Sequence, residues 1–231
     1  SAASDVYKRQ GQMLVRNLFF SLEAAIRGWL DGKANYFEPI PLGGAIRGPS
    51  VAKVLTSHLP GFKAGDLIFG LHHWEDYSLS DANTILLSKL TPEADIPLSY
   101  YAGGLGGSGH TAYVGLHEIG KIQAGDTVVI SAAAGATGSM ATQIAKLRGC
   151  KVVGIVGGDN KCQIVTDTLG ADAAINYKTC EDLTSAIHEA CPEGVDVYFD
   201  NVGGKTLDAA LSCMNTFCLL YTSPSPRDVE E

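Results

Sequence analysis

In the first half of the chain, short apolar runs alternate with glycine, proline and asparagine, and no helical periodicity is sustained. The apolar runs lie at Leu14–Leu22, Val51–Leu55 and Asp66–Leu71. Short strands separated by such turn residues are typical of an antiparallel barrel or sandwich. The segment Gly61–Asp66 predicts a turn leading into a strand at Leu67–Phe69, because glycine accepts the positive φ that tight turns need. The first half is therefore predicted to be a β-rich domain.

Beyond Gly103 the pattern changes to apolar runs that alternate with amphipathic stretches. Four runs are predicted to be parallel strands, and the first has the continuous apolar character of a buried one. They lie at Thr127–Ser131, Lys151–Val156, Ala173–Tyr177 and Val195–Asp200. One predicted helix carries Met140, Ile144 and Leu147 on a single apolar stripe. Further helices are predicted at Asn160–Leu169, Glu181–Ala190 and Lys205–Met214. This alternation of strands and helices predicts an α/β domain with a doubly wound parallel sheet.

Composition indicates a packed chain and excludes some classes of partner. Of the 231 residues, 45% are hydrophobic and 18% are charged, and the formal net charge is -8. An acidic chain without a run of lysine and arginine is a poor binder of nucleic acid or of an anionic membrane surface. No apolar stretch approaches the roughly 20 residues that span a bilayer. The N-terminus also lacks the pattern of a secretory signal.

The cysteines indicate a reducing compartment. All six lie after residue 149 and no two form a CxxC pair; they are Cys150, Cys162, Cys180, Cys191, Cys213 and Cys218. Isolated thiols of this kind are typical of cytoplasmic proteins rather than of disulfide frameworks or zinc sites. The histidines His72, His73, His110 and His117 have no cysteine or carboxylate partners at metal-ligand spacing. We therefore expect a cytoplasmic location and no bound metal.

A loop of small residues follows the first strand of the α/β half. It runs from Ala132 to Gly138 and carries two of the three glycines of a GxGxxG motif, with Ala133 in the first place. Small side chains let backbone N–H groups touch a pyrophosphate, and the following helix N-terminus favours negative charge. The position between a strand and a helix predicts a dinucleotide-binding loop. A turn that needs small residues only for packing would carry the same pattern.

The end of the second strand bears on which dinucleotide is bound. NAD sites usually place Asp or Glu there to bind the ribose hydroxyls. Here Gly157 and Gly158 end the strand, and Asp159 comes slightly late for that role. Lys161 could instead bind the 2′-phosphate of NADP, although an ordinary solvated lysine of a first helical turn would look the same.

The segments with the most specific pattern are VVISAAAGATGSMATQIAKLRGCKVVGIVGG (128–158) and GVDVYFDNVGG (194–204). Weaker ones are VRNLFFSLEAAIRGWLDG (15–32), GFKAGD (61–66) and TAYVGL (111–116). Together they resemble the zinc-independent branch of the medium-chain dehydrogenases/reductases, and within it the prostaglandin reductase and alkenal double-bond reductase family with its curcumin-reductase-like bacterial members. The resemblance implies a GroES-like β-rich domain followed by a Rossmann domain.

The two ends depart from the pattern between them. Residues 1–10 and 218–231 resemble translated adapter sequence, and Pro224 and Pro226 could not lie in the buried strand that the preceding pattern demands. We therefore predict four segments: 1–10 as non-native, 11–102 as the GroES-like substrate domain, 103–217 as an incomplete NADP-binding Rossmann domain, and 218–231 as non-native. We expect the ends to contribute nothing to the core, and the parallel sheet to stop after its fourth strand.

The resemblance assigns cofactor contacts position by position. Gly135, Ala136, Thr137 and Gly138 match the family's pyrophosphate loop. Lys161 matches its lysine on the 2′-phosphate, Tyr177 a tyrosine near the adenosine end, and Asn201 an asparagine at the cofactor. The family's proton-relay tyrosine lies beyond Phe217 and has no counterpart here, so the catalytic residue is unknown.

The implied activity is reduction of the carbon–carbon double bond of an α,β-unsaturated carbonyl compound, with NADP(H) as cofactor. The implied partners are a small enone or enal substrate and, for the complete protein, a second copy in a homodimer. Departures at Glu23-Ala24, Ala25, Gly107-Ser108 and His110 put the substrate preference in doubt. A quinone reductase of the same superfamily and an NADPH-binding protein without turnover stay open as alternatives. The chain as given is expected to be inactive.

Overall fold

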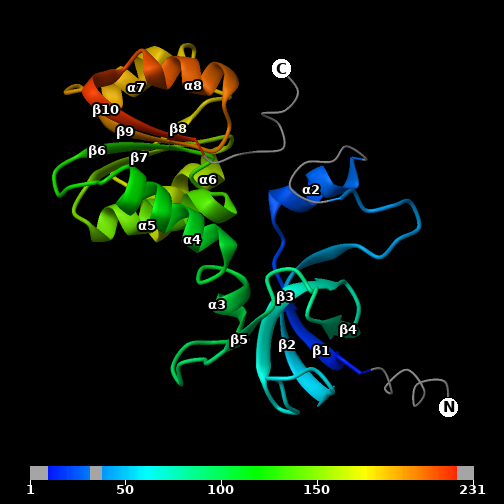
Figure 1. Cartoon of the computed structure of the whole chain (residues 1–231). Coiled ribbons are helices and arrows are strands. Elements are labelled where there is room, and N and C mark those ends of the chain that lie inside the picture. Colours follow the sequence, from blue (N-terminus) through cyan, green and yellow to red (C-terminus); the bar gives the residue numbers. More distant parts are fainter. Residues whose placement is uncertain (1–9, 32–37, 223–231) are drawn as a thin grey trace. The chain divides into compact units, whose positions relative to one another are not determined.

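The structure is a computed structural model that describes residues 10–31 and 38–222 (Figure 1). The chain divides into two compact units between Gly106 and Gly107, close to the boundary predicted after residue 102. Predictions for residues 1–9 and 223–231, including Pro224 and Pro226, lie outside the described residues. In the described ranges, no helix is both long and apolar enough to cross a membrane.

The first unit is built on an antiparallel sheet with the strand order β4-β1-β2-β3-β5. Its strands are β1 (Gln12–Phe20), β2 (Arg47–Ser57), β3 (Leu67–His73), β4 (Tyr77–Asp81) and β5 (Ser88–Leu90). The predicted turn before β3 is present, and Gly61 and Gly65 adopt φ values of 87° and 92° there. The prediction of an antiparallel β-rich domain is therefore confirmed.

A short helix in this unit was not predicted from the sequence pattern. Helix α2 (Ala24–Leu30) is only 7 residues long, too short to establish a helical period. It buries Ile26 and Trp29 against Ile40 and Leu71, which form a small separate cluster. A second short helix, α3 (Ser99–Ala102), ends just before the second unit.

The second unit is a parallel sheet with the strand order β10-β9-β6-β7-β8 and helices on both faces (Figure 1). Its strands are β6 (Thr127–Ser131), β7 (Lys151–Val156), β8 (Ala173–Asn176), β9 (Val195–Asp200) and β10 (Met214–Thr222). Its helices are α4 (Gly107–Tyr113), α5 (Ala136–Leu147), α6 (Asp159–Gln163), α7 (Leu183–Ala190) and α8 (Gly204–Leu211). Two π-helical segments extend α4 and α6, namely η2 (Val114–Ile119) and η3 (Ile164–Thr168). The predicted doubly wound α/β fold is confirmed.

The buried face of α5 differs from the predicted one. The pattern placed Leu147 with Met140 and Ile144 on the core stripe, but Leu147 is 88% exposed. The face against the sheet consists of small side chains, among them Ala141 and Ala145, which are fully buried. Small residues let the helix approach the sheet closely, so the face that is buried is not the face with the largest apolar side chains.

The expectation that residues 218–231 contribute nothing to the core is wrong for residues 218–222. They form the second half of β10, which pairs in parallel with β9 from Leu219↔Val197 to Thr222↔Asp200. The Tyr221 ring packs on Phe199 at a centroid distance of 4.8 Å. An apolar segment with an aromatic residue suits a strand beside β9, where the pattern called for one. The sheet therefore has a fifth strand, and the edge of β9 is covered.

Candidate functional site

The loop between β6 and α5 turns sharply at the carboxyl end of the central strand. Ala132 adopts a φ of 47°, and the Gly135 amide donates to its carbonyl oxygen at 2.8 Å. A Cβ added to Gly138 would lie 2.2 Å from that same oxygen and 2.9 Å from Ala133 Cα. These neighbours are backbone atoms that cannot move aside, so only glycine lets α5 begin this close to β6. Gly138 is therefore required for the close packing of α5 on β6.

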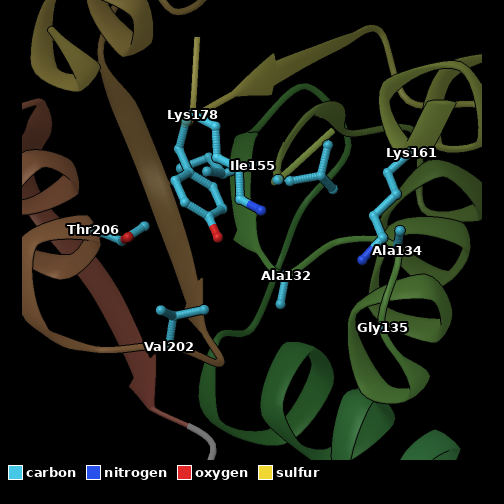
Figure 2. Close-up of a pocket in the computed structure, with 11 residues that line it drawn as sticks. Ala132, Ala134, Gly135, Ile155, Lys161, Lys178, Val202 and Thr206 are labelled. Carbon is cyan, nitrogen blue, oxygen red and sulfur yellow. The ribbon is translucent and has the colours of Figure 1, made fainter. Parts of the chain in front are cut away.

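A pocket of about 230 Å³ opens beside this loop (Figure 2). It lies at the carboxyl ends of parallel strands, where doubly wound sheets bind their ligands. Its lining comes from the loop, the ends of β7 and β8, α6, and the segment from β9 into α8; the residues are Ala132, Ala134, Gly135, Ile155, Val156, Gly157, Lys161, Tyr177, Lys178, Val202 and Thr206. The volume is below the roughly 300–1,000 Å³ of whole-ligand pockets, so it suits part of a dinucleotide.

Two lysines give the pocket its positive charge. Lys161 extends from α6 and Lys178 follows the end of β8, and Figure 2 shows them on different sides of the pocket. Among the described residues, neither lysine forms a salt bridge, while four other ion pairs are present. Both ammonium groups are therefore available to an anionic ligand.

The carboxylate nearest in sequence to Lys161 is engaged elsewhere. Asp159 Oδ1 accepts a hydrogen bond from Asn176 Nδ2 at 2.6 Å. Asn176 Oδ1 accepts in turn from the Lys178 amide at 3.2 Å. Asn176 therefore links the start of α6 to the turn after β8, and Asp159 does not line the pocket. That Asp159 comes too late for the ribose role stays a prediction.

Tyr177 lies directly over Gly157 at the end of β7. A Cβ on Gly157 would be 2.9 Å from both Tyr177 Cε1 and the Tyr177 hydroxyl oxygen. Glycine at this position is therefore needed for the ring to reach the pocket wall. Tyr177 is 49% exposed, so part of the residue is open to a ligand.

Asn201 lies at the end of β9 but does not line the pocket. Its side-chain Nδ2 donates to the Ser131 carbonyl oxygen at 2.8 Å, and its backbone N–H donates to Ser131 Oγ at 2.7 Å. In this structure Asn201 thus joins the ends of β6 and β9. Of the predicted cofactor residues, the pocket brings together Gly135, Lys161 and Tyr177, while Ala136, Thr137 and Gly138 lie in the adjoining start of α5.

The turn after β9 is organised by a buried carboxylate. Asp200 is 1% exposed, and its Oδ1 accepts from the amides of Val202 and Gly203 at 3.1 and 3.0 Å. The Tyr198 hydroxyl also donates to it at 3.1 Å, and burial raises the pKa of that phenol. These bonds fix Val202 at the pocket wall.

Ala132 and Ala134 belong to the predicted loop, and the other lining residues were not identified from the sequence, namely Ile155, Val156, Gly157, Lys178, Val202 and Thr206. Most are small or apolar residues whose role depends on the strand register, for which the pattern holds no signal. Thr206 lies in the first turn of α8, directly after the GVDVYFDNVGG segment. Its position beside that segment was the signal that could have identified it.

The donor set does not favour a metal ion. Within residues 10–31 and 38–222, no three His, Cys, Asp or Glu side chains form a group that could hold one. Burial raises the pKa of the Cys150 and Cys191 thiols to about 11, so both stay protonated near neutral pH and are poor metal ligands. His72 is buried among serines, with Ser50 Oγ 2.6 Å from its Nδ1. The expectation of no bound metal stays a prediction.

Two family models match the chain. A model described as "N-terminal domain of oxidoreductase" matches residues 6–87, and one described as "Zinc-binding dehydrogenase" matches residues 136–217. The two matches fall in the first and second structural units respectively.

The chain is similar to several characterised reductases. It is 39% identical to the NADPH-dependent curcumin reductase of Escherichia coli (strain K12), over 90% of this chain and 59% of the relative. It is 42% identical to the 2-alkenal reductase (NADP(+)-dependent) of Nicotiana tabacum, over 89% of this chain and 60% of the relative. The crystal structure of CurA in complex with NADPH from Vibrio vulnificus superposes with a TM-score of 0.81 at 40% identity, covering 92% of this chain and 62% of that chain. The chain thus spans about 60% of the length of these relatives.

Proposed function

The chain belongs to the enone reductase family of the medium-chain dehydrogenases/reductases, and from this we propose that it binds NADPH as part of a reductase acting on α,β-unsaturated carbonyl compounds. The observation that carries the proposal is the pocket at the carboxyl edge of the parallel sheet, which combines a small-residue loop, a tyrosine face and two free lysines. Each of these features suits one portion of the dinucleotide.

The residues present fit NADPH better than NADH. The loop from Ala132 to Gly138 offers backbone N–H groups and the start of α5 to the pyrophosphate. Lys161 supports a 2′-phosphate, and Asp159, the acidic candidate for a ribose, is bonded to Asn176. Tyr177 offers a ring face to the adenosine half. We assign Asn201 to the cofactor on the family resemblance. To contact the cofactor, the Asn201 side-chain amide would have to break its hydrogen bond to the Ser131 carbonyl oxygen or donate a second one.

The chemistry at the substrate follows from the cofactor. Bound NADPH supplies the hydride for the conjugated double bond. The chain's residues would hold and orient the adenosine and pyrophosphate parts of the cofactor. No zinc is required, because conjugation with the carbonyl already activates the double bond.

We further propose a cytoplasmic location and a homodimeric complete protein that acts on small molecules, with no nucleic acid or membrane partner. The acidic net charge of -8 supports the absence of a nucleic acid or membrane partner, and the six free thiols support the cytoplasmic location. The homodimer and the small-molecule substrate are carried over from the family resemblance.

The activity is tested with a version of the protein extended to the length of its relatives. We expect NADPH-dependent saturation of a simple enone, identified by mass spectrometry of the product. Reduction of quinones with the enone left intact would favour a quinone reductase. Tight NADPH binding with no oxidation on either substrate class would favour a binding protein without turnover.

Replacement of Lys161 by alanine tests the cofactor preference. A hydrogen bond to a charged group contributes about 1.5–3 kcal/mol, so Lys161→Ala should weaken NADPH by about tenfold or more. NADH lacks the 2′-phosphate, and its affinity should change little. Fluorescence titration of both nucleotides measures the difference, and an equal loss for both would show that Lys161 does not bind the phosphate.

A further inference from the structure

A second lysine lines the pocket, and no part of the cofactor has been assigned to it. Lys178 lies in the turn that follows β8, next to Tyr177. Figure 2 shows its side chain extending into the pocket from a different element than Lys161. An exposed lysine after a strand resembles any solvated lysine in sequence, and only the fold places this one beside the cofactor pocket.

The charge of the ligand calls for more than one cation. A phosphate monoester carries about -1.5 to -2 charges at neutral pH, and one lysine neutralises only one of them. In the described part of the chain, neither Lys161 nor Lys178 forms an ion pair with a carboxylate. Two unpaired ammonium groups lining one small pocket repel each other, and an anion between them removes that repulsion.

The two lysines are held on linked segments. Asn176 donates to Asp159 Oδ1 in α6 at 2.6 Å and accepts from the Lys178 amide at 3.2 Å. The same hydrogen-bonded side chain therefore fixes the turn carrying Lys178 against the helix carrying Lys161. It also occupies one oxygen of Asp159, which leaves that oxygen less available to pair with a lysine.

We propose that Lys178 is a second specificity determinant for NADPH, and that it binds the 2′-phosphate together with Lys161. The inference rests on the proposed function, because it requires that the pocket take the adenosine half of NADPH. Both lysines act as charge-assisted hydrogen-bond donors, which are stronger than neutral ones.

The test uses two small ligands that differ only in the 2′-phosphate: adenosine 2′,5′-bisphosphate and adenosine 5′-monophosphate. Calorimetry on the 231-residue chain measures binding of both, so no catalytic turnover is needed. Lys178→Ala should weaken the bisphosphate by about tenfold and leave the monophosphate unchanged. Lys178→Arg should retain most of the affinity, and the variant that lacks both lysines should bind the two ligands alike. The control is Lys53→Ala. Lys53 is an exposed lysine of β2 in the first unit, so its replacement removes one positive charge without touching the pocket lining.

The outcomes separate this inference from the proposed function. If the unmodified chain does not prefer the bisphosphate, both are overturned. If it prefers the bisphosphate and Lys178→Ala keeps that preference, only the role of Lys178 is overturned. An equal loss for both ligands in Lys178→Ala would also overturn it, because such a loss indicates a damaged pocket wall rather than recognition of the phosphate. If Lys53→Ala weakens binding as much as Lys178→Ala does, the loss comes from the change in net charge alone, and the role of Lys178 is overturned as well.

Discussion

Replacing Gly138 by alanine is expected to weaken NADPH binding by about tenfold or more and to lower the free energy of unfolding of the second unit by about 3 kcal/mol. The added Cβ would lie 2.2 Å from the Ala132 carbonyl oxygen and 2.9 Å from the Ala132 carbonyl carbon. Since both atoms belong to the backbone at the end of β6, α5 must move away from the sheet. The amides at its start then no longer face the pyrophosphate.

The matched control is Gly135→Ala in the same loop. Gly135 has a φ of -79° and a ψ of 176°, which any residue can adopt, and its added Cβ would meet one atom at 3.1 Å. Gly135 lines the pocket, so this variant should lose affinity with a much smaller loss of stability than Gly138→Ala. Hydrogen exchange of the β6 and α5 amides, with nucleotide titration, measures both effects. Equal stability of the two variants would refute the close-packing argument for Gly138.

The parallel sheet was predictable because its strands are marked by composition. The strands β6, β7 and β9 begin and end at the predicted residues, since each is a short run rich in apolar residues that alternates with helical segments. Strand β10 was not predicted, because residues 218–231 were excluded on their resemblance to adapter sequence. The apolar residues of this segment nevertheless pair with β9. A strand is selected by its neighbour as well as by its own pattern.

A residue of the candidate site could be predicted from the sequence only where its local backbone geometry allows a single residue type. Glycine at 138 is required by a strand-to-helix turn, and that requirement is visible in the motif. The pairing of Asp159 with Asn176 depends on the register of β7 and β8, and the sequence carries no sign of it. Lys178 enters the pocket for the same reason. Side chains that meet across parallel strands come from distant parts of the chain, so their proximity follows from the fold.

Acidification is expected to destabilise the first unit through His72. This side chain is 3% exposed, and burial, with a contribution from the charge of His73, lowers its pKa to about 4. In the unfolded chain the pKa is near 6.5. Between these values the unfolded state binds a proton that the folded state excludes, so stability is complete above about pH 6.5 and falls as the pH approaches 4. The full loss corresponds to about 3 kcal/mol.

The pKa of His72 is lowered because a neutral imidazole already satisfies the polar network around it. Ser50 Oγ lies 2.6 Å from His72 Nδ1 and Ser80 Oγ lies 3.3 Å from His72 Nε2. Ser80 also donates to Thr84 Oγ1 at 2.9 Å. A neutral imidazole donates from one nitrogen and accepts at the other. Because the Ser80 proton is directed at Thr84, Ser80 Oγ accepts from His72 Nε2–H, and the Ser50 hydroxyl donates to His72 Nδ1. In this network no carboxylate faces the ring to stabilise an added positive charge, so protonation costs the full desolvation of a buried cation.

Tryptophan fluorescence isolates the effect, because both tryptophans of the chain, Trp29 and Trp74, belong to the first unit. Urea unfolding at pH 7 and at pH 4.5 gives the pH dependence of its stability. His72→Gln should lower stability at pH 7 but remove most of the difference between the two pH values. The exposed His58→Gln serves as the matched control and should keep that difference. Aspartates also titrate at low pH, yet they do so equally in all three proteins, so parallel pH profiles for the chain and His72→Gln would show that His72 is not the group responsible.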